Sequence, residues 1–220
     1  EARDGVHGQE LWITDGTPDG TEMVGDLFPD PPSNGIGNFP YHFTSLGDGR
    51  VIFAAYPRES GQEPWATQLW VTDGTAENSE VIAEVTATEG WGDPPSFTSF
   101  IPSEVTQLGD GRAVFALNDG AHGKEIWASD GTRAGTGMLV DINPGRADGD
   151  PSDITALGDG RAVFQADDGT HGEEFWITDG TEAGTRMVSD ISPGSGGSLP
   201  SDFVVLGAGS GSDLPQTTGN

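Results

Sequence analysis

The sequence predicts an all-β fold, specifically a β-propeller of about four four-stranded blades. Three observations predict it: one eight-residue string recurs four times, Asp-Gly turns separate short apolar runs, and these runs are apolar on both sides. The chain of 220 residues contains 35 Gly and 15 Pro, and no stretch keeps the 3.6-residue period of a helix. An open arc of blades or a linear array of β-repeats is the alternative.

The recurring string marks a strand and the turn that ends it. It reads ELWITDGT at 10–17, and its relatives are QLWVTDGT at 68–75, EIWASDGT at 125–132 and EFWITDGT at 174–181. The Trp residues of the four strings are 58, 57 and 49 residues apart. Self-similarity at a period of roughly 20–50 residues indicates a solenoid, a propeller or an array.

Each period has room for four short strands. In the third repeat, strands are expected at 124–129, 135–142, 154–158 and 161–167, with Gly, Asp and Pro turns between them. The string LGDGR joins the last two strands of a period and recurs at 46–50, 108–112 and 157–161. Asp-Gly between apolar runs predicts a hairpin with a type I′ turn, which needs positive φ at both central positions.

The strand after LGDGR is expected to be covered on both faces. In the first repeat, Val51, Phe53 and Ala55 point to one side of this strand. Ile52 and Ala54 point to the other side, and both sides are apolar, as in strands that lie between two packed layers. Four antiparallel strands per period, buried on both faces, predict blades that pack against blades.

A single repeat domain is expected at 1–207, followed by a Gly/Ser-rich tail or linker at 208–220. The repeats run at about 4–56, 57–118, 119–167 and 168–207. The first ten residues match 165–174, so the chain opens at the tail of a fourth-type strand, and the fourth repeat lacks its last strand. We therefore expect a ring that closes only in part or receives a strand from another segment, and a chain that is a piece of a longer protein.

Composition narrows the class of partner. The chain carries 36 acidic and 9 basic residues, a net charge of −27. This charge disfavours nucleic acids and anionic membranes and attracts cations. It suits a salty or calcium-bearing medium, or equally a soluble surface that implies no partner. The lack of Cys excludes disulfides and thiolate metal sites, and no apolar run approaches the ~20 residues of a membrane span.

The repeat strings resemble those of the ELWxxDGT repeat proteins, a bacterial family of mostly large, propeller-like proteins that are predicted to be secreted. The resemblance covers residues 4 to about 207 and rests on ITDGTPDGTEMVGDL, ASDGTRAGTGMLVDINPG and ITDGTEAGTRMVSDISPG. The second repeat departs from the pattern, because VTDGTAENSEVIAEV lacks the second GT and the Asp-Ile pair. The resemblance implies a secreted location and a repeat scaffold, and it implies no settled activity.

The repeated acidic residues have a metal-binding and a structural interpretation. The Asp of DGT either binds calcium or caps backbone N–H groups in a turn, and its presence in every repeat favours the turn. The connector DG-x-HG-x-E offers Asp119 and Asp168 as metal ligands, but a His hydrogen-bonded inside a tight loop is the better interpretation. A loop calcium site is also a candidate at the Asp of V-x-D, which is Asp26, Asp141 or Asp190.

The repeated basic residues indicate a turn contact. Arg50, Arg112 and Arg161 occupy one repeat position, directly after Asp-Gly. Three of nine cations in register predict an Arg–Asp pair across each turn.

Function in a repeat scaffold is expected where the repetition fails, at 28–43, 55–68 and 88–104. These segments carry the candidate ligand-binding residues Tyr41, His42, Tyr56, Trp65, Trp91, Phe97 and Phe100. Aromatic rings beside carboxylates suit stacking on sugar rings. The alternative is that these aromatics fill a channel or form a contact between chains.

Three functions follow from the sequence. The first is a secreted, non-enzymatic propeller module that binds a glycan or a surface ligand or associates with copies of itself, with calcium as a structural ion. The second is a carbohydrate-active propeller enzyme, a glycosidase or a lyase. The third is a structural segment of an extracellular fibre. No catalytic residue is assigned, because no G-x-S-x-G elbow occurs and no carboxylate pair stands out among so many.

Overall fold

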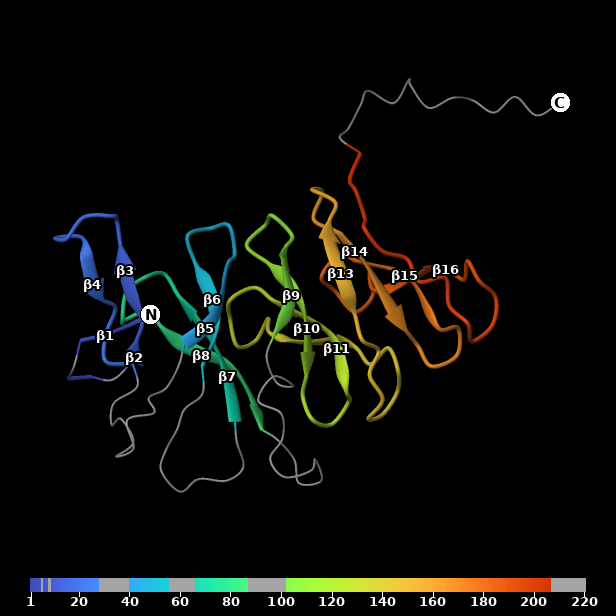
Figure 1. Cartoon of the computed structure of the whole chain (residues 1–220), viewed down its shortest axis with the longest axis horizontal. Helices are drawn as coiled ribbons and strands as arrows, with labels where there is room; N and C mark the ends of the chain where they lie inside the picture. Colours follow the sequence, from blue (N-terminus) through green and yellow to red (C-terminus); the bar gives the residue numbers. More distant parts are fainter. Residues whose placement is uncertain (5, 8, 28–39, 56–65, 87–101, 207–220) are drawn as a thin grey trace.

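The computed structural model describes residues 1–4, 6–7, 9–27, 40–55, 66–86 and 102–206 (Figure 1). All regular structure in these residues is β, in antiparallel sheets of two or four strands, and no sheet closes into a barrel. This part of the chain contains no helix, and so none that could cross a membrane. The all-β prediction is therefore confirmed.

The strands follow one another along the chain and pair with their sequence neighbours. The N-terminal unit comprises β1 (Ala2–Arg3), β2 (Gln9–Glu10), β3 (Trp12–Thr14) and β4 (Thr21–Met23), in two pairs. Sheet I comprises β5 (Pro40–Ser45), β6 (Val51–Ala55), β7 (Ala66–Thr72) and β8 (Glu80–Thr86). Sheet II comprises β9 (Ser103–Gln107), β10 (Ala113–Asn118), β11 (Lys124–Ser129) and β12 (Gly137–Val140). Sheet III comprises β13 (Ser152–Ala156), β14 (Ala162–Asp167), β15 (Glu173–Thr178) and β16 (Arg186–Ser189).

The hydrogen-bonded sheets are offset from the sequence repeats. The Trp strand β15 is the third strand of sheet III, and its Trp176 lies opposite Phe164 of β14. Sheets II and III thus each take two strands from before a His connector and two from after it. In the N-terminal unit, Ala2 pairs with Glu10 just as Ala166 pairs with Glu174, so β1 corresponds to the last residues of β14.

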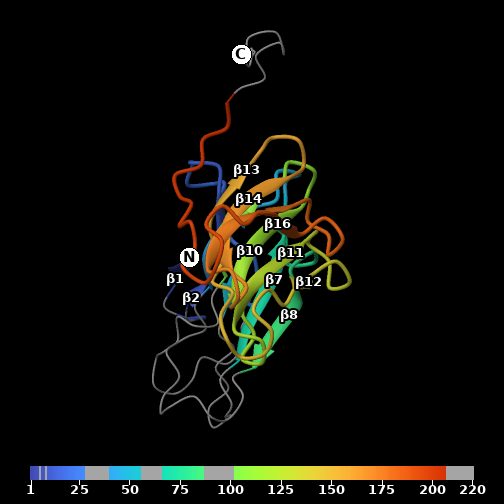
Figure 2. The same cartoon turned by 90° about the vertical axis from the view of Figure 1, so that its right-hand side faces the viewer.

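The sheets stand side by side in an open row. The N-terminal unit lies at one end of the longest axis and sheet III at the other, with sheets I and II between them (Figure 1). In the view along this row the sheets lie behind one another (Figure 2). The described strands therefore form a repeat array.

Each sheet buries one face against each neighbour. On β10, Phe115 and Leu117 face sheet I, whereas Val114 faces sheet III. On β6, Phe53 faces the N-terminal unit and Ile52 faces sheet II, so the prediction of strands covered on both faces is confirmed. We call the face toward the N-terminal unit the N-face and the opposite one the C-face. Phe115 and Phe164, the equivalents of Phe53, lie on the N-faces of sheets II and III, so equivalent residues point the same way in all three sheets.

The LGDGR strings form the predicted hairpins, but the predicted turn type is wrong. Gly47 and Gly49 take positive φ (85° and 93°), while Asp48 between them does not. The backbone N–H of Leu46 donates to the carbonyl of Arg50 at 2.8 Å, which encloses three residues rather than the two of a type I′ turn. This arrangement leaves the Asp48 side chain in position to accept from Arg50.

Candidate functional site

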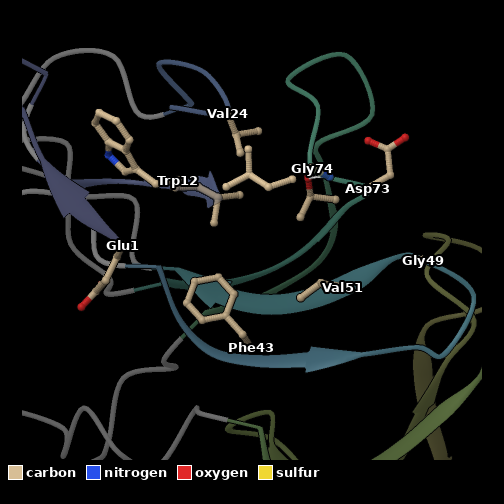
Figure 3. Close-up of a pocket in the computed structure, with 11 residues that line it drawn as sticks. Glu1, Trp12, Val24, Phe43, Gly49, Val51, Asp73 and Gly74 are labelled. Carbon is tan, nitrogen blue, oxygen red and sulfur yellow. Dashed lines mark hydrogen bonds between the residues drawn. The ribbon is translucent and has the colours of Figure 1, made fainter. Parts of the chain in front are cut away.

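A cavity lies at the junction of the N-terminal unit and sheet I. It has a volume of about 330 Å³. Trp12 and Val24 line one side of it, and Phe43 and Val51 line the other (Figure 3). Its edge is formed by the DGT turn at Gly74. Because the lining is mostly apolar, this cavity suits an apolar side chain rather than a reacting polar group.

The cavity exists at a place that the other two junctions fill. Between sheets I and II, Leu46 and Ile52 occupy the corresponding space and are 0% and 1% exposed. Between sheets II and III, Leu108 and Val114 do the same. These residues come from the first two strands of a sheet and the turn between them. Among the described residues, the N-terminal unit has no first strand and only the tail of the second, so Phe43 stays 44% exposed.

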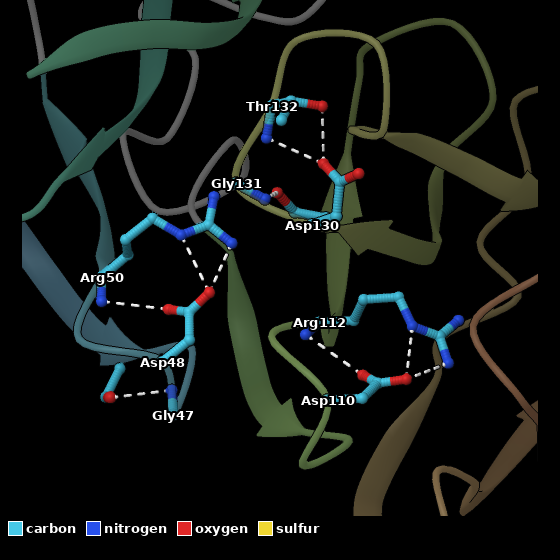
Figure 4. Close-up of polar contacts among 10 residues, drawn as sticks. Gly47, Asp48, Arg50, Asp110, Arg112, Asp130, Gly131 and Thr132 are labelled. Atoms are coloured by element: carbon cyan, nitrogen blue, oxygen red, sulfur yellow. Dashed lines mark hydrogen bonds and ion pairs between the residues drawn. The ribbon is translucent and has the colours of Figure 1, made fainter. Parts of the chain in front are cut away.

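The DGT strings are structural turns, as expected. The Asp130 Oδ1 accepts hydrogen bonds from the backbone N–H and the hydroxyl of Thr132, at 2.8 and 2.6 Å (Figure 4). Gly131 between them has a φ of 78°. The same two bonds recur at Asp15, Asp73 and Asp179. The Thr181 hydroxyl contributes most to holding the pKa of the Asp179 carboxyl below its usual range.

The predicted Arg–Asp pairs are present and reach further than expected. The Arg112 guanidinium donates through Nε and Nη2 to Asp110 Oδ2, at 2.8 and 2.5 Å (Figure 4). Its Nη1 donates to the backbone carbonyl of Asp179 at 2.8 Å, in the DGT turn of the next sheet. Arg50 approaches the corresponding turn at Gly131. These arginines therefore join adjacent sheets, which spacing alone did not reveal.

The His connectors are closed by their own Asp. The Asp119 Oδ1 accepts from the backbone N–H groups of Ala121 and His122, both at 2.8 Å. The Asp119 Oδ2 lies 2.7 Å from His122 Nδ1. The hydrogen bond to Asp119 raises the pKa of His122. The connector of Asp168 repeats this geometry. Both predicted metal ligands thus already accept three hydrogen bonds within their own loops.

The Glu two positions before the Trp in three of the four strings, which is Glu10, Glu125 or Glu174, has a role that sequence reasoning missed. Glu125 is fully buried, and it accepts hydrogen bonds from the backbone N–H groups of Ile142 and Gly149 at 2.9 and 2.8 Å. It therefore clamps the loop that leads from sheet II to sheet III. Burial raises the pKa of Glu125 to about 7, and that of Glu10 likewise to about 7. The alternation of this Glu with Trp on one face of the strand was the signal that could have shown its burial.

Glu174 of sheet III, the equivalent of Glu125, shows how hydrogen-bond donors change the pKa of a buried Glu. Burial opposes the ionisation of Glu174, but its pKa is nevertheless lowered, because the Ser198 hydroxyl and the backbone N–H groups of Ile191 and Ser192 donate to it. In sheet I the position is Gln68, whose amide donates to Glu84 and accepts from the Trp70 indole.

The remaining predicted metal ligands lie at the start of the loops that follow β4, β12 and β16. The Asp141 Oδ2 accepts from the backbone N–H of Gly145 at 3.2 Å. The Oδ1 atoms of Asp141 and Asp190 are buried, and no hydrogen-bond partner for them occurs in the described structure. Asp26 lies close enough to Glu10 to favour the protonated form of that Glu. Over the described ranges, no three His, Asp or Glu side chains converge as a metal site.

Two of the predicted ligand-binding aromatics lie on β5. The rings of Tyr41 and His42 meet edge to face with centroids 5.3 Å apart, and His42 is exposed. The strand registers place the start of β5, the end of β6, the start of β7 and the end of β8 together at one end of sheet I. The other candidates lie outside the described residues; they are Tyr56, Trp65, Trp91, Phe97 and Phe100.

Comparison with known proteins does not place the chain in a family, since no family model matches it and a search of curated proteins finds no match.

Proposed function

We propose that the chain is a secreted, non-enzymatic β-repeat module that serves in binding or assembly, and that its sheets are successive blades of a propeller-like arc. The observation that carries this proposal is the apolar cavity beside Phe43 and Val51, a junction that is left partly unfilled. Equivalent residues face the same way in sheets I, II and III, which supports the blade interpretation, because a propeller repeats one blade in one orientation. The resemblance to ELWxxDGT repeat proteins supports the secreted location.

The hydrogen bonds that the repeated polar residues make also favour a binding function over a catalytic one. The Asp of each DGT caps its own turn, the Asp of each His connector binds its own His, and Glu125 clamps a loop. Each of these groups recurs in other sheets with the same partners. A group that several sheets use in the same way to build themselves is a poor candidate for a unique reaction centre.

We propose that such a module binds a glycan or a cell-surface group, and that the ligand binds at the end of sheet I that carries Tyr41 and His42. Exposed aromatic rings stack on sugar faces, and neighbouring carboxylates accept sugar hydroxyls. The test is a glycan array probed with the 220-residue chain, run beside sedimentation of the chain alone. Binding or self-association supports the module, whereas release of reducing sugar from a bound glycan, with neither stable binding nor association, would favour the enzyme instead.

Calcium is our proposed structural ion for the loops that begin at Asp141 and Asp190. The buried Oδ1 of each Asp has no hydrogen-bond partner in the described structure, and calcium takes six to eight oxygen ligands that include backbone carbonyls. Asp119 and Asp168 fit this role less well, because His and backbone N–H groups already use their oxygens.

A further inference from the structure

Four buried polar atoms in sheets II and III form two matching pairs. In sheet II they are Trp127 Nε1 and Asp141 Oδ1, and in sheet III they are Trp176 Nε1 and Asp190 Oδ1. None of the four has a hydrogen-bond partner in the described structure. An indole N–H can only donate a hydrogen bond and an ionised carboxylate can only accept one. Each pair therefore consists of one donor and one acceptor that are left unsatisfied.

Sheet I satisfies the same pair of positions with the amide of Gln68. The Gln68 Oε1 accepts from the Trp70 indole Nε1 at 3.1 Å, and the Gln68 Nε2 donates to Glu84 Oε2 at 3.0 Å. In the aligned repeats, Trp70 is the counterpart of Trp127, and Glu84 is the counterpart of Asp141. A single group that both accepts and donates thus bridges this donor and this acceptor in sheet I.

The backbone arranges these positions alike in the three sheets. The ladder between the last two strands shifts register directly before the Trp in sheets I, II and III. In sheet I this ladder places Gln68 opposite Glu84, and in sheet II its register extends to the equivalent residues, Glu125 and Asp141. Glu125 and Trp127 are two positions apart on one strand, so they point to the same face. The space between Trp127 and Asp141 therefore corresponds to the place of the Gln68 amide.

The Glu side chain of sheet II does not make this bridge, because it binds elsewhere. The Glu125 carboxylate accepts from the backbone N–H groups of Ile142 and Gly149. An ionised carboxylate also has no hydrogen to donate to Asp141, whereas the Gln68 amide has two. The same holds in sheet III, where Glu174 accepts from the loop after β16.

The group that completes each bridge has to be small and has to both accept and donate. Glu125 and Glu174 are 0% exposed and Trp176 is 9% exposed, so these sites are closed to solvent. A metal ion cannot accept from an indole N–H, whereas a water molecule accepts and donates at once. An Asp side chain is one methylene shorter than the Glu84 side chain of sheet I, which leaves more room for a water molecule.

We propose that sheets II and III each bind one buried water molecule at the place that the Gln68 amide occupies in sheet I. In sheet II the water accepts from Trp127 Nε1 and donates to Asp141 Oδ1, and the Glu125 carboxylate accepts its second hydrogen. Three hydrogen bonds are usual for a buried water. The proposal is independent of the ligand and the partner proposed above. It is compatible with calcium at the same Asp, because a carboxylate has about four acceptor sites.

These water molecules let one residue position hold the loop that follows. In sheet I the Gln68 side chain is used within the sheet, where it joins β7 to β8 through Glu84. In sheet II the water makes the equivalent link between β11 and the residue after β12. Glu125 is thereby free to hold Ile142 and Gly149 in the loop that leads to sheet III.

The indole N–H groups allow a test on the unaltered protein. Rotating-frame NOEs between water and the assigned indole N–H protons are measured on the isotope-labelled 220-residue chain. We expect a cross-peak of a long-lived water at Trp127 and at Trp176, and none at Trp70, which is the matched control because Gln68 binds its N–H directly. Absence of the cross-peak at both Trp127 and Trp176, or a cross-peak of equal intensity at Trp70, would overturn the proposal.

A double variant transfers the arrangement of sheet I to sheet II. In Glu125→Gln with Asp141→Glu, the new amide should take the place of the water, so the cross-peak at Trp127 should be lost. The cross-peak at Trp176 should remain, and the unchanged chemical shift of its indole N–H shows that sheet III is still folded. A cross-peak that persists at Trp127 in the folded variant would overturn the proposal. If the variant does not fold, a high-resolution map of the parent chain decides: it should show a water at about 2.7–3.2 Å from each Trp Nε1, and two sites without one would overturn the proposal.

Discussion

The interpretation of DGT as a structural turn predicts opposite effects for two nearby glycines. A Cβ added at Gly135 would lie about 2.2 Å from the Asp130 carboxylate, whereas a Cβ at Gly137 would meet nothing within 4 Å. Neither glycine has positive φ in the described structure, so backbone strain does not enter. The change Gly135→Ala must push Asp130 away from Thr132, and Gly137→Ala displaces nothing.

The magnitude follows from the bonds at stake. Asp130 makes two hydrogen bonds to Thr132, each worth about 0.5–1.5 kcal/mol net. Alanine in place of glycine also restricts the unfolded chain and returns about 0.4–1 kcal/mol. We therefore expect Gly135→Ala to lower the free energy of unfolding by about 0.5–2 kcal/mol. Gly137→Ala should raise it by about 0.4–1 kcal/mol.

Urea unfolding followed by Trp fluorescence measures both effects, and a double-mutant cycle assigns their cause. In an Asp130→Ala background, Gly135→Ala should no longer destabilise the chain, because the displaced carboxylate is gone. Gly135→Asn should cost less than Gly135→Ala, since the corresponding Asn78 of sheet I donates its amide to Asp73 at 2.7 Å. An equal cost of Gly135→Ala with and without Asp130 would refute the reasoning.

Three further predictions concern stability and ions. Phe115→Ala should cost about 3–5 kcal/mol of unfolding free energy, because Phe115 is fully buried; the half-exposed Phe43→Ala should cost clearly less, and equal costs in urea unfolding would contradict the packing described. The melting temperature should fall as the pH rises from 5 to 8. The raised pKa values of Glu10, Glu125 and His122 mean that the folded chain holds protons that the unfolded chain releases. The contribution of the Glu residues is lost between about 4.5 and 7, and that of His122 as the pH passes through its raised pKa, so a melting temperature that rises over this range would contradict these assignments. Added calcium should raise the melting temperature and a chelator should lower it. The change Asp141→Asn should reduce the shift caused by calcium. A melting temperature of the parent chain that responds to neither would contradict calcium as a structural ion.

Local patterns in the sequence predicted much of the fold. Alternation in 51–55 revealed a strand buried on both faces, because side-chain direction alternates with a period of two. The Asp-Gly strings located the hairpins, but they did not determine the turn type. The extra glycine at 47 permits a three-residue loop that frees Asp48 for Arg50, and this choice depends on a contact made after folding.

The repeat pattern could not predict the contacts between sheets. The bond from Arg112 to the carbonyl of Asp179 joins residues 67 positions apart, and spacing within a repeat says nothing about it. The repeats also did not show which four consecutive strands form one sheet, because a repeated string is the same wherever the unit is taken to begin. The cavity beside Phe43 arises from strands without counterparts in the N-terminal unit as described, so no single motif pointed to it.

The most direct test of the account is an experimental map of the 220-residue chain. The account predicts sheets I, II and III in one row, with the Arg112 guanidinium donating to the backbone carbonyl of Asp179 across the junction of sheets II and III. A map in which the sheets do not pack in this order, or in which Arg112 does not reach the turn at Asp179, would contradict it.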